Sequence, residues 1–321
     1  MVEKEKIQRA KAVTVYSDRY RDHLAPKYWL TWIGLAGMAI LSRFPRAAIL
    51  YFGKSLGYLL YFFARRRRQI TATNIALCFK ELDAVEQQAL IKQTIIDNGV
   101  GLLEMCVAWF NFEQIRPAMI DIVGEQTLRD AVAEGKGVIL VGAHYTTLDL
   151  GGVLMAKYHK VGVMYRANKN PLFDLVMRNS RRKFCETVIE RGDMRSVIRF
   201  IKNGGVMWYA PDQDYGPKQS VFAPFFGVEA ATINVIPRLV KINNSPVLIL
   251  GHHRTSDQSG YTVSISRLPE GFPSGDDDVD AATINLELEA QIRKFPAQYM
   301  WMHRRFKTRP AGQKRPYPAR K

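Results

Sequence analysis

Short apolar runs alternate with amphipathic stretches between residues 136 and 295. The runs have the length and the flanking turn residues of buried strands, and the stretches between them have helical periodicity. Strands are expected at 138–142, 161–166, 186–189, 205–210, 246–251 and 261–267. Helices are expected at 147–157, 171–184, 193–203, 232–243 and 280–295. This alternation predicts an α/β fold in which helices flank a largely parallel or mixed central sheet.

The pattern before residue 136 is helical and strongly apolar in places. Trp29–Leu41 carries no charge, and residues 47–64 carry only Lys54 among many aromatic side chains. Four consecutive arginines follow at 65–68, an order typical of a chain that meets an anionic membrane surface. We predict a membrane anchor at 29–68, either a single pass or a segment embedded in one leaflet. A soluble helical hairpin is the alternative.

A second helical stretch follows the arginines. Residues 67–110 are expected to be helical, and Asp83 with Glu86 has the spacing of a capping box at the start of a long helix. The glycines at 99 and 101 allow close packing or a kink within that helix.

The charge is unevenly distributed. Residues 1–80 carry a net charge of +11 and residues 301–321 carry +8, so the 220 residues between them sum to −3 within the total of +16. Two basic ends around a nearly neutral centre indicate an anionic surface as partner, and the apolar N-terminal segment favours a membrane over nucleic acid. The three cysteines are odd in number and widely spaced, which suits a reducing compartment and argues against a disulfide framework or a zinc site.

The most informative polar pair is His144 and Asp149. His144 lies where the strand at 138–142 opens into a loop, and Asp149 falls in the first turn of the next helix. Side chains at the carboxyl ends of strands in α/β sheets face the crevice where ligands bind. An imidazole whose Nδ1–H is held by a carboxylate keeps Nε2 free as a general base, and the nucleophile would be a substrate hydroxyl. The alternative is a chance spacing in which Asp149 only stabilises the helix dipole.

Polar residues also follow two other predicted strands. Arg166 and Asn168 come after the strand at 161–166, and Arg166 shares the edge of His144 if the two strands are neighbours. Its guanidinium would stabilise an oxyanion or bind a phosphate; the alternative is an ordinary surface ion pair. Asp212 and Asp214 follow the fourth strand and form either a turn or the polar floor of a pocket. Metal ligation by them is a weaker interpretation, because no histidine or further carboxylate joins them.

One predicted helix carries a basic cluster, made of Arg178, Arg181, Arg182 and Lys183. Such a cluster is either a solvated helix face or a docking site for an acidic carrier protein.

Several longer motifs surround these candidates and resemble a known family. They are His144-x4-Asp149, Tyr165-Arg166-x-Asn168-x-Asn170-Pro, Trp208-Tyr-Ala-Pro-Asp212-x-Asp214-Tyr-Gly-Pro217, Val221-Phe-x-Pro-Phe-Phe-Gly227 and Gln298-Tyr-Met-Trp301-x-His303-Arg-Arg-Phe-Lys-Thr-Arg-Pro310. Together with the entry at 26–32 they resemble the bacterial late acyltransferases of lipid A biosynthesis over residues 23–310, closer to the lauroyl/palmitoleoyl branch than to the myristoyl branch. The His-x4-Asp motif alone marks only the wider glycerolipid acyltransferase superfamily.

The resemblance implies a glycerol-phosphate acyltransferase-like fold and an activity. The expected reaction moves a fatty acyl chain from acyl-[acyl carrier protein] to a hydroxyl of a Kdo-bearing lipid A precursor. It implies His144 and Asp149 as catalytic residues, with Arg166 beside them, and Asp149 stands where some relatives carry Glu. Arg166, Asn168, Asp212 and Asp214 are the candidates for substrate binding or oxyanion stabilisation.

The expected partners are the carrier protein, the lipid A precursor and the lipids of the bacterial inner membrane, with no nucleic acid. No metal or bound cofactor is expected, because the carrier thioester is a co-substrate. The catalytic domain is expected to face the cytoplasm. The predicted parts of the chain are a polar lead at 1–28, the anchor at 29–68, a catalytic domain at 69–310 and a basic flexible tail at 311–321. A lysophospholipid or glycerol-phosphate acyltransferase and a non-enzymatic basic membrane-binding protein are the rival functions.

Overall fold

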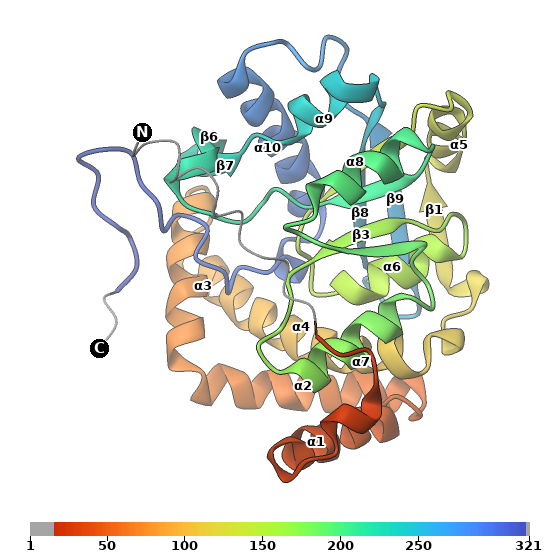
Figure 1. Cartoon of the computed structure of the whole chain (residues 1–321). Helices are drawn as coiled ribbons and strands as arrows, with labels where there is room; N and C mark the ends of the chain where they lie inside the picture. Colours follow the sequence, from red (N-terminus) through yellow and green to blue (C-terminus); the bar gives the residue numbers. More distant parts are fainter. Residues whose placement is uncertain (1–15, 319–321) are drawn as a thin grey trace, which may run out of the picture.

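A seven-stranded sheet forms the centre of the computed structural model, which describes residues 16–318 (Figure 1). The strand order is β1-β9-β8-β2-β5-β3-β4, and every neighbouring pair is parallel except the antiparallel pair β8–β9. The strands are β1 (Ile120–Val123), β2 (Val138–Gly142), β3 (Gly162–Tyr165), β4 (Thr187–Glu190), β5 (Val206–Tyr209), β8 (Val247–Arg254) and β9 (Tyr261–Arg267). The predicted α/β fold with a mixed, mostly parallel sheet is therefore confirmed.

Helices cover both faces of the sheet because the side chains of each strand alternate between them. In β2, Ile139 and Val141 pack with α8, α9 and α10 on one face. Val138 and Leu140 pack with α5, α6 and α7 on the other. These helices are α5 (Glu125–Ala133), α6 (Leu148–Ala156), α7 (Pro171–Arg181), α8 (Met194–Lys202), α9 (Ile236–Asn243) and α10 (Asp277–Lys294).

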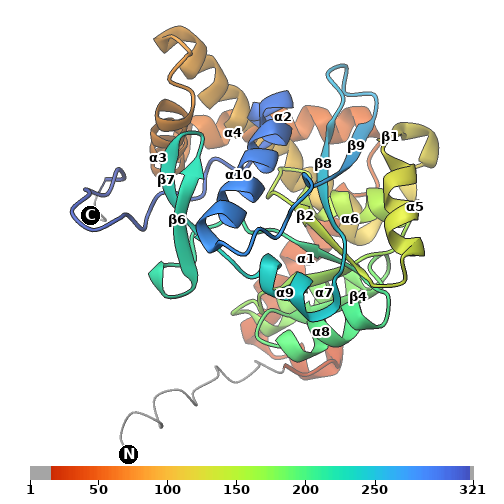
Figure 2. The same cartoon turned by 90° about the horizontal axis from the view of Figure 1, so that it is seen from above.

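All six strands predicted from the sequence are present, but three further strands and one helix were missed. Strand β1 and helix α5 are short and lie at the edge of the sheet. Strands β6 (Ser220–Phe225) and β7 (Val228–Ile233) form a separate antiparallel hairpin that packs against α10 (Figure 2). This hairpin corrects the predicted start of the helix at 232, since α9 begins only at Ile236 after the second strand.

Four helices at the N-terminal side lie at one end of the sheet. They are α1 (Trp29–Leu41), α2 (Arg46–Phe63), α3 (Arg65–Cys78) and α4 (Ala84–Phe110). The predicted capping box is confirmed, because Asp83 accepts the backbone N–H of Glu86 and the Glu86 side chain accepts that of Asp83. Helix α4 passes beside the loop after β2: a Cβ on Gly101 would lie 2.3 Å from the backbone oxygen of Thr146.

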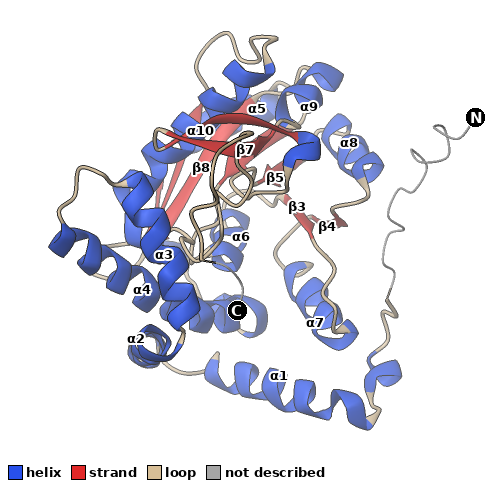
Figure 3. Ribbon diagram, turned by 90° about the vertical axis from the view of Figure 1, so that its left-hand side faces the viewer, coloured by secondary structure: helices blue, strands red, loops and turns tan. Residues whose placement is uncertain are grey.

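Helices α1 and α2 pack against α4, and Figure 3 shows both on the outer side of the molecule, away from the sheet. Helix α2 approaches α4 very closely, since a Cβ on Gly99 would lie 2.4 Å from the backbone nitrogen of Gly57. Among residues 16–318, no single helix is long and apolar enough to cross a membrane. Only α2 and α3 taken together reach that length and composition, and they are bent by 91°. The predicted apolar segment is thus two helices joined by a break, followed by the arginines at the start of α3.

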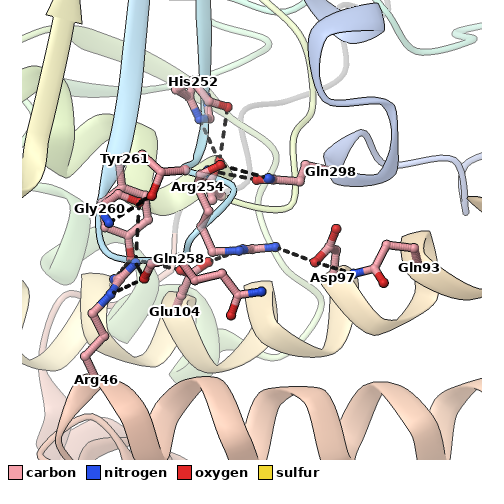
Figure 4. Close-up of polar contacts among 12 residues, drawn as sticks. Arg46, Gln93, Asp97, Glu104, His252, Arg254, Gln258, Gly260, Tyr261 and Gln298 are labelled. Atoms are coloured by element: carbon pink, nitrogen blue, oxygen red, sulfur yellow. Dashed lines mark hydrogen bonds and ion pairs between the residues drawn. The ribbon is translucent and has the colours of Figure 1, made fainter.

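A buried polar network joins these helices to the sheet (Figure 4). Arg254, at the end of β8, donates to Glu104 at 2.5 Å and to Asp97 at 3.0 Å, and both carboxylates lie on α4. The hydroxyl of Tyr261 donates to Glu104 at 2.8 Å, and the Gln298 side chain pairs with the backbone N–H and C=O of Arg254. A buried charge that kept no partner would be strongly destabilising, so each element of this network depends on the others.

The two ends of the chain lie partly outside the described residues, namely 1–15 of the predicted polar lead and 319–321 of the predicted tail. Within the described part of the tail, the Tyr317 hydroxyl accepts the backbone N–H of Phe306 and donates to Asn74. That tyrosine is therefore fixed against the body of the protein.

Candidate active site

His144 lies at the carboxyl end of β2, as predicted, and its partner comes from the neighbouring strand. The register pairs Val141 of β2 with Tyr209 of β5, so three residues further along each chain His144 meets Asp212. Asp212 accepts two hydrogen bonds from this residue, one from the His144 backbone N–H at 2.9 Å and one from its ring Nδ1 at 2.6 Å. The pair is a carboxylate and an imidazole in direct contact at the edge of the sheet.

Asp212 is suited to keep its negative charge. Its burial by itself would raise the pKa of the carboxyl, but the charge and the hydrogen bonds of His144 outweigh burial and hold that pKa at about 2. An ionised Asp212 can only accept, so Nδ1 of His144 carries a proton, and in the neutral form of the ring Nε2 is the nitrogen without one. The His144 side chain is 17% exposed and Asp212 only 1%, which places the imidazole at an opening and the carboxylate behind it.

Asp149 does not contact His144, which corrects the predicted pair. Asp149 lies in the first turn of α6, and its Oδ1 accepts from Nε of Arg181 at 2.6 Å. Arg181 ends α7, so this nearly buried ion pair links the start of one helix to the end of another. No hydrogen bond or ion pair between Asp149 and His144 occurs within the described chain. The turn at 145–147 gives the two side chains different partners.

The Asp149 pair also corrects the prediction for the basic cluster on α7. Arg181 is bound to Asp149, and Arg178 is buried with ion pairs to Asp174 and Asp18. Only Arg182 and Lys183 are exposed. The cluster is therefore mainly a set of structural ion pairs.

Arg166 and Asn168, the two candidates that follow β3, differ from each other in exposure and in contacts. Strands β2 and β3 are not neighbours, because β5 lies between them, although all three end at the same edge. Arg166 is exposed at that edge and has no ion pair among residues 16–318. Asn168 is held in the loop: its backbone N–H donates to Asp174 at 2.7 Å, and its side chain accepts from the backbone of Asn170 at 2.9 Å. Asn168 thus shapes the turn that begins α7.

Asp214 anchors the C-terminal segment. It accepts the backbone N–H of Thr308 at 2.6 Å and the hydroxyl of Thr308 at 2.9 Å, and Lys307 lies 3.7 Å away. Asp214 thus has one of the two roles predicted for these acids, since it also accepts the backbone N–H of Gly216 at 2.9 Å and fixes a turn. Asp212 is the hydrogen-bond partner of His144, and its role as the floor of a pocket stays a prediction.

The same C-terminal segment supports the loop that carries His144. The backbone oxygen of His144 accepts from Met300 at 2.9 Å, and the backbone N–H of Thr146 donates to Gln298 at 2.7 Å, just after the short helix η6 (Pro296–Gln298). From the other side, the Thr147 hydroxyl lies 2.8 Å from Nδ1 of the buried His252. These contacts hold the backbone of the loop, and the hydrogen bond to Asp212 orients the imidazole.

The sequence analysis gave no individual role to Arg181, which binds Asp149, or to His303, which binds Asp214. There, Arg181 belongs to a basic cluster and His303 to the C-terminal motif. His303 accepts the backbone N–H of Asp214 at its Nε2, at 3.2 Å. The signal that marks it is its place in a motif whose neighbours contact the His144 loop. Among the described residues, no group of three or more His, Cys, Asp or Glu side chains is arranged to hold a metal.

Comparison with known proteins gives a consistent result over almost the whole chain. A family model for the bacterial lipid A biosynthesis acyltransferases matches residues 18–308. The chain is 37% identical over 291 residues to the lipid A biosynthesis lauroyltransferase of Escherichia coli (strain K12), covering 90% of this chain and 95% of the relative. It is 36% identical over 294 residues to the palmitoleoyltransferase of the same organism, covering 91% and 96%. Identity to the myristoyltransferase of that organism is 28% over 299 residues, covering 91% of both chains.

Proposed function

Since the chain belongs to the bacterial lipid A biosynthesis acyltransferases, we propose that it transfers a fatty acyl chain from acyl-[acyl carrier protein] to a hydroxyl of a Kdo-bearing lipid A precursor. Membership of this family, on the lauroyl/palmitoleoyl side, agrees with the resemblance found in the sequence. The observation that carries the proposal is the contact of His144 with Asp212, which leaves Nε2 of the imidazole available as a base.

In the proposed reaction His144 acts first. Its Nε2 removes the proton of the acceptor hydroxyl as the hydroxyl oxygen attacks the carbonyl carbon of the thioester. The tetrahedral oxyanion then collapses, the C–S bond breaks, and the departing thiolate takes the proton back from the imidazolium. The products are an ester on the lipid and a free thiol on the carrier, and no metal or bound cofactor enters the scheme.

Asp212 takes the orienting role that the sequence analysis gave to Asp149. Its charge stabilises the imidazolium while the proton is held, and its bond to Nδ1 keeps the ring in the required tautomer. Asp149 serves the site through Arg181 by fixing α6, which follows the His144 loop directly. Arg166 is exposed and forms no ion pair within residues 16–318, which suits it to bind an anionic group of the lipid acceptor.

We assign membrane binding to the outer sides of α1 and α2. Large apolar side chains are exposed there, among them Leu30 at 81% and Phe63 at 82%, and Phe63 comes two residues before the arginines at 65–68. Exposed apolar side chains beside a basic cluster suit insertion into one leaflet of an anionic membrane. The cytoplasmic side of the inner membrane is proposed from the family and from its acyl-[acyl carrier protein] donor, because these charges alone do not fix the orientation.

This assignment predicts that Phe62→Ser with Phe63→Ser weakens membrane binding by about tenfold or more, because burial of one Phe side chain contributes about 1.5–3 kcal/mol. The wild-type protein should stay with anionic vesicles in a salt wash, since apolar burial is not screened. Co-sedimentation with vesicles measures both effects. The double variant Val279→Ser with Leu286→Ser is the control, because it removes exposed apolar side chains from α10 instead. Equal losses in the two double variants would contradict the assignment.

The catalytic proposal is tested by an acyl-transfer assay with purified protein, an acyl-[acyl carrier protein] donor and two acceptor classes. Transfer to a Kdo-bearing lipid A precursor, and little to lysophospholipid or glycerol phosphate, is the expected result. The reverse preference would indicate the glycerolipid rival. Absence of transfer to either acceptor, by a protein that is folded and bound to vesicles, would leave only a binding function.

A further inference from the structure

His303 is held rigidly beside the catalytic pair. Its backbone N–H donates to Met300 at 3.2 Å, and its backbone oxygen accepts from the side chain of the buried Asn74 at 2.7 Å. Met300 in turn donates its backbone N–H to the backbone oxygen of His144, and the His303 ring accepts from the backbone N–H of Asp214, two residues after Asp212. His303 therefore lies at the active site without contacting His144 directly.

One hydrogen bond defines the protonation of this ring. The backbone N–H of Asp214 points at Nε2 of His303 at 3.2 Å, and a backbone N–H can only donate. Nε2 must accept, so it carries no proton. Burial, the main influence, lowers the pKa of His303 to about 4, and the ring is consequently neutral near pH 7. A neutral imidazole without a proton on Nε2 has its proton on Nδ1.

The Nδ1–H of His303 is available to a ligand. It has no acceptor among residues 16–318, and it is not among the buried polar atoms that lack a partner, so it reaches accessible space. A neutral donor of this kind also avoids a conflict with His144. A charged His303 would oppose the imidazolium that forms on His144, whereas a neutral ring donates without adding positive charge.

We propose that His303 is a catalytic residue whose Nδ1–H donates a hydrogen bond to the thioester carbonyl oxygen as that oxygen becomes an oxyanion. The inference rests on the proposed acyl transfer and adds a donor to it. The proton stays on His303 throughout, because the acceptor proton passes only between the hydroxyl, His144 and the departing thiolate. A preorganised donor at a developing oxyanion contributes about 10²–10³ in kcat.

Two amide substitutions separate this role from a merely structural one. The side-chain nitrogen of His303→Asn can lie near the place of Nδ1, whereas the amide of His303→Gln reaches the place of Nε2 and can accept from Asp214. We expect His303→Asn to retain kcat within about tenfold of wild type. We expect His303→Gln to lose about 10²–10³ in kcat with KM nearly unchanged, since the lost contact strengthens only in the transition state.

The opposite order would overturn the proposal, because a residue that only supports the Asp214 backbone is better replaced by Gln. Wild-type kcat in both variants would overturn it as well. Thermal unfolding of both proteins shows whether a loss arises from misfolding. An inactive wild-type protein would instead defeat the proposed acyl transfer, so the two failures are distinguishable.

A spectroscopic measurement on the full chain decides the matter if neither variant folds. With ring-labelled ¹⁵N-histidine, the His303 imidazole should have its proton on Nδ1 and a pKa lowered by burial to about 4. His252 and His253 also have lowered pKa values, about 3 and about 4, so the His303 ring is assigned through its hydrogen bond with the backbone N–H of Asp214. A spectrum without such an imidazole would overturn the inference.

Discussion

His144→Ala is expected to lower kcat by about 10²–10⁴-fold, the usual value of a general base. The variant should remain folded and bound to membranes. The His144 loop is held by backbone contacts from Met300 and Gln298, which the substitution leaves in place. Acyl-transfer rates, thermal unfolding and vesicle binding measure the three properties.

A matched control is His159→Ala, since His159 lies after α6, outside the contacts that build the site. Its activity should equal that of the wild type. If His144→Ala keeps activity within tenfold of the wild type, His144 is not the base. If it loses activity only together with its folded state, its role is structural.

Asp212→Asn is expected to reduce kcat by about 10³–10⁴-fold although the two side chains are nearly the same size. The amide NH₂ of the new residue would donate to Nδ1 of His144 and favour the tautomer with the proton on Nε2. In that tautomer Nε2 cannot accept a proton from the substrate. The neutral amide would also fail to stabilise the imidazolium. Initial rates at saturating donor and acceptor measure the effect, and thermal unfolding reports whether the buried site tolerates the change.

A double-mutant comparison identifies which carboxylate serves His144. In the His144→Ala background, Asp212→Asn should lower kcat little further, because the effects of substitutions at residues that act as a unit are strongly non-additive. Asp149→Asn should instead cost the same factor in both backgrounds, since its partner is Arg181. If Asp149→Asn were the substitution that loses its effect in the His144→Ala protein, the pair first inferred from the sequence would be restored.

The sequence was sufficient for six of the nine strands described and for the position of His144 at the end of one of them. Strand β2 was predicted with its observed bounds because it is a continuous apolar run, and His144 followed from where that run ends. The family was recognisable because its motifs lie at several separate places along the chain. The hairpin β6–β7 was missed because one strand contains Pro224, which is unusual within a strand, and because the two strands join directly through Phe226 and Gly227 at positive φ.

The hydrogen-bond partner of His144 could not be predicted from the sequence, because its identity depends on the order of the strands in the sheet. Asp149 is near in the chain, whereas Asp212 is 68 residues away and comes close only because β5 pairs with β2 and separates it from β3. The hydrophobic periodicity of the sequence predicts each strand separately and does not show which strands are neighbours in the sheet. Asp212 was therefore identified as polar and placed at the correct edge, but its contact could only be seen in the folded chain.

The close approach of α2 and α4 has a consequence for how the enzyme can be handled. Gly57 and Gly99 bring the two backbones together, and Arg46 at the start of α2 donates to the backbone of Gln258 beside β9. The segment that we propose binds the membrane therefore also covers part of the protein interior, and it cannot be removed without exposing that interior. Cutting the chain after residue 68 would uncover the inner side of α4 together with the Arg254 network that it covers. To obtain a water-soluble version of this enzyme, the exposed apolar side chains of α1 and α2 have to be replaced by polar ones, with both helices retained.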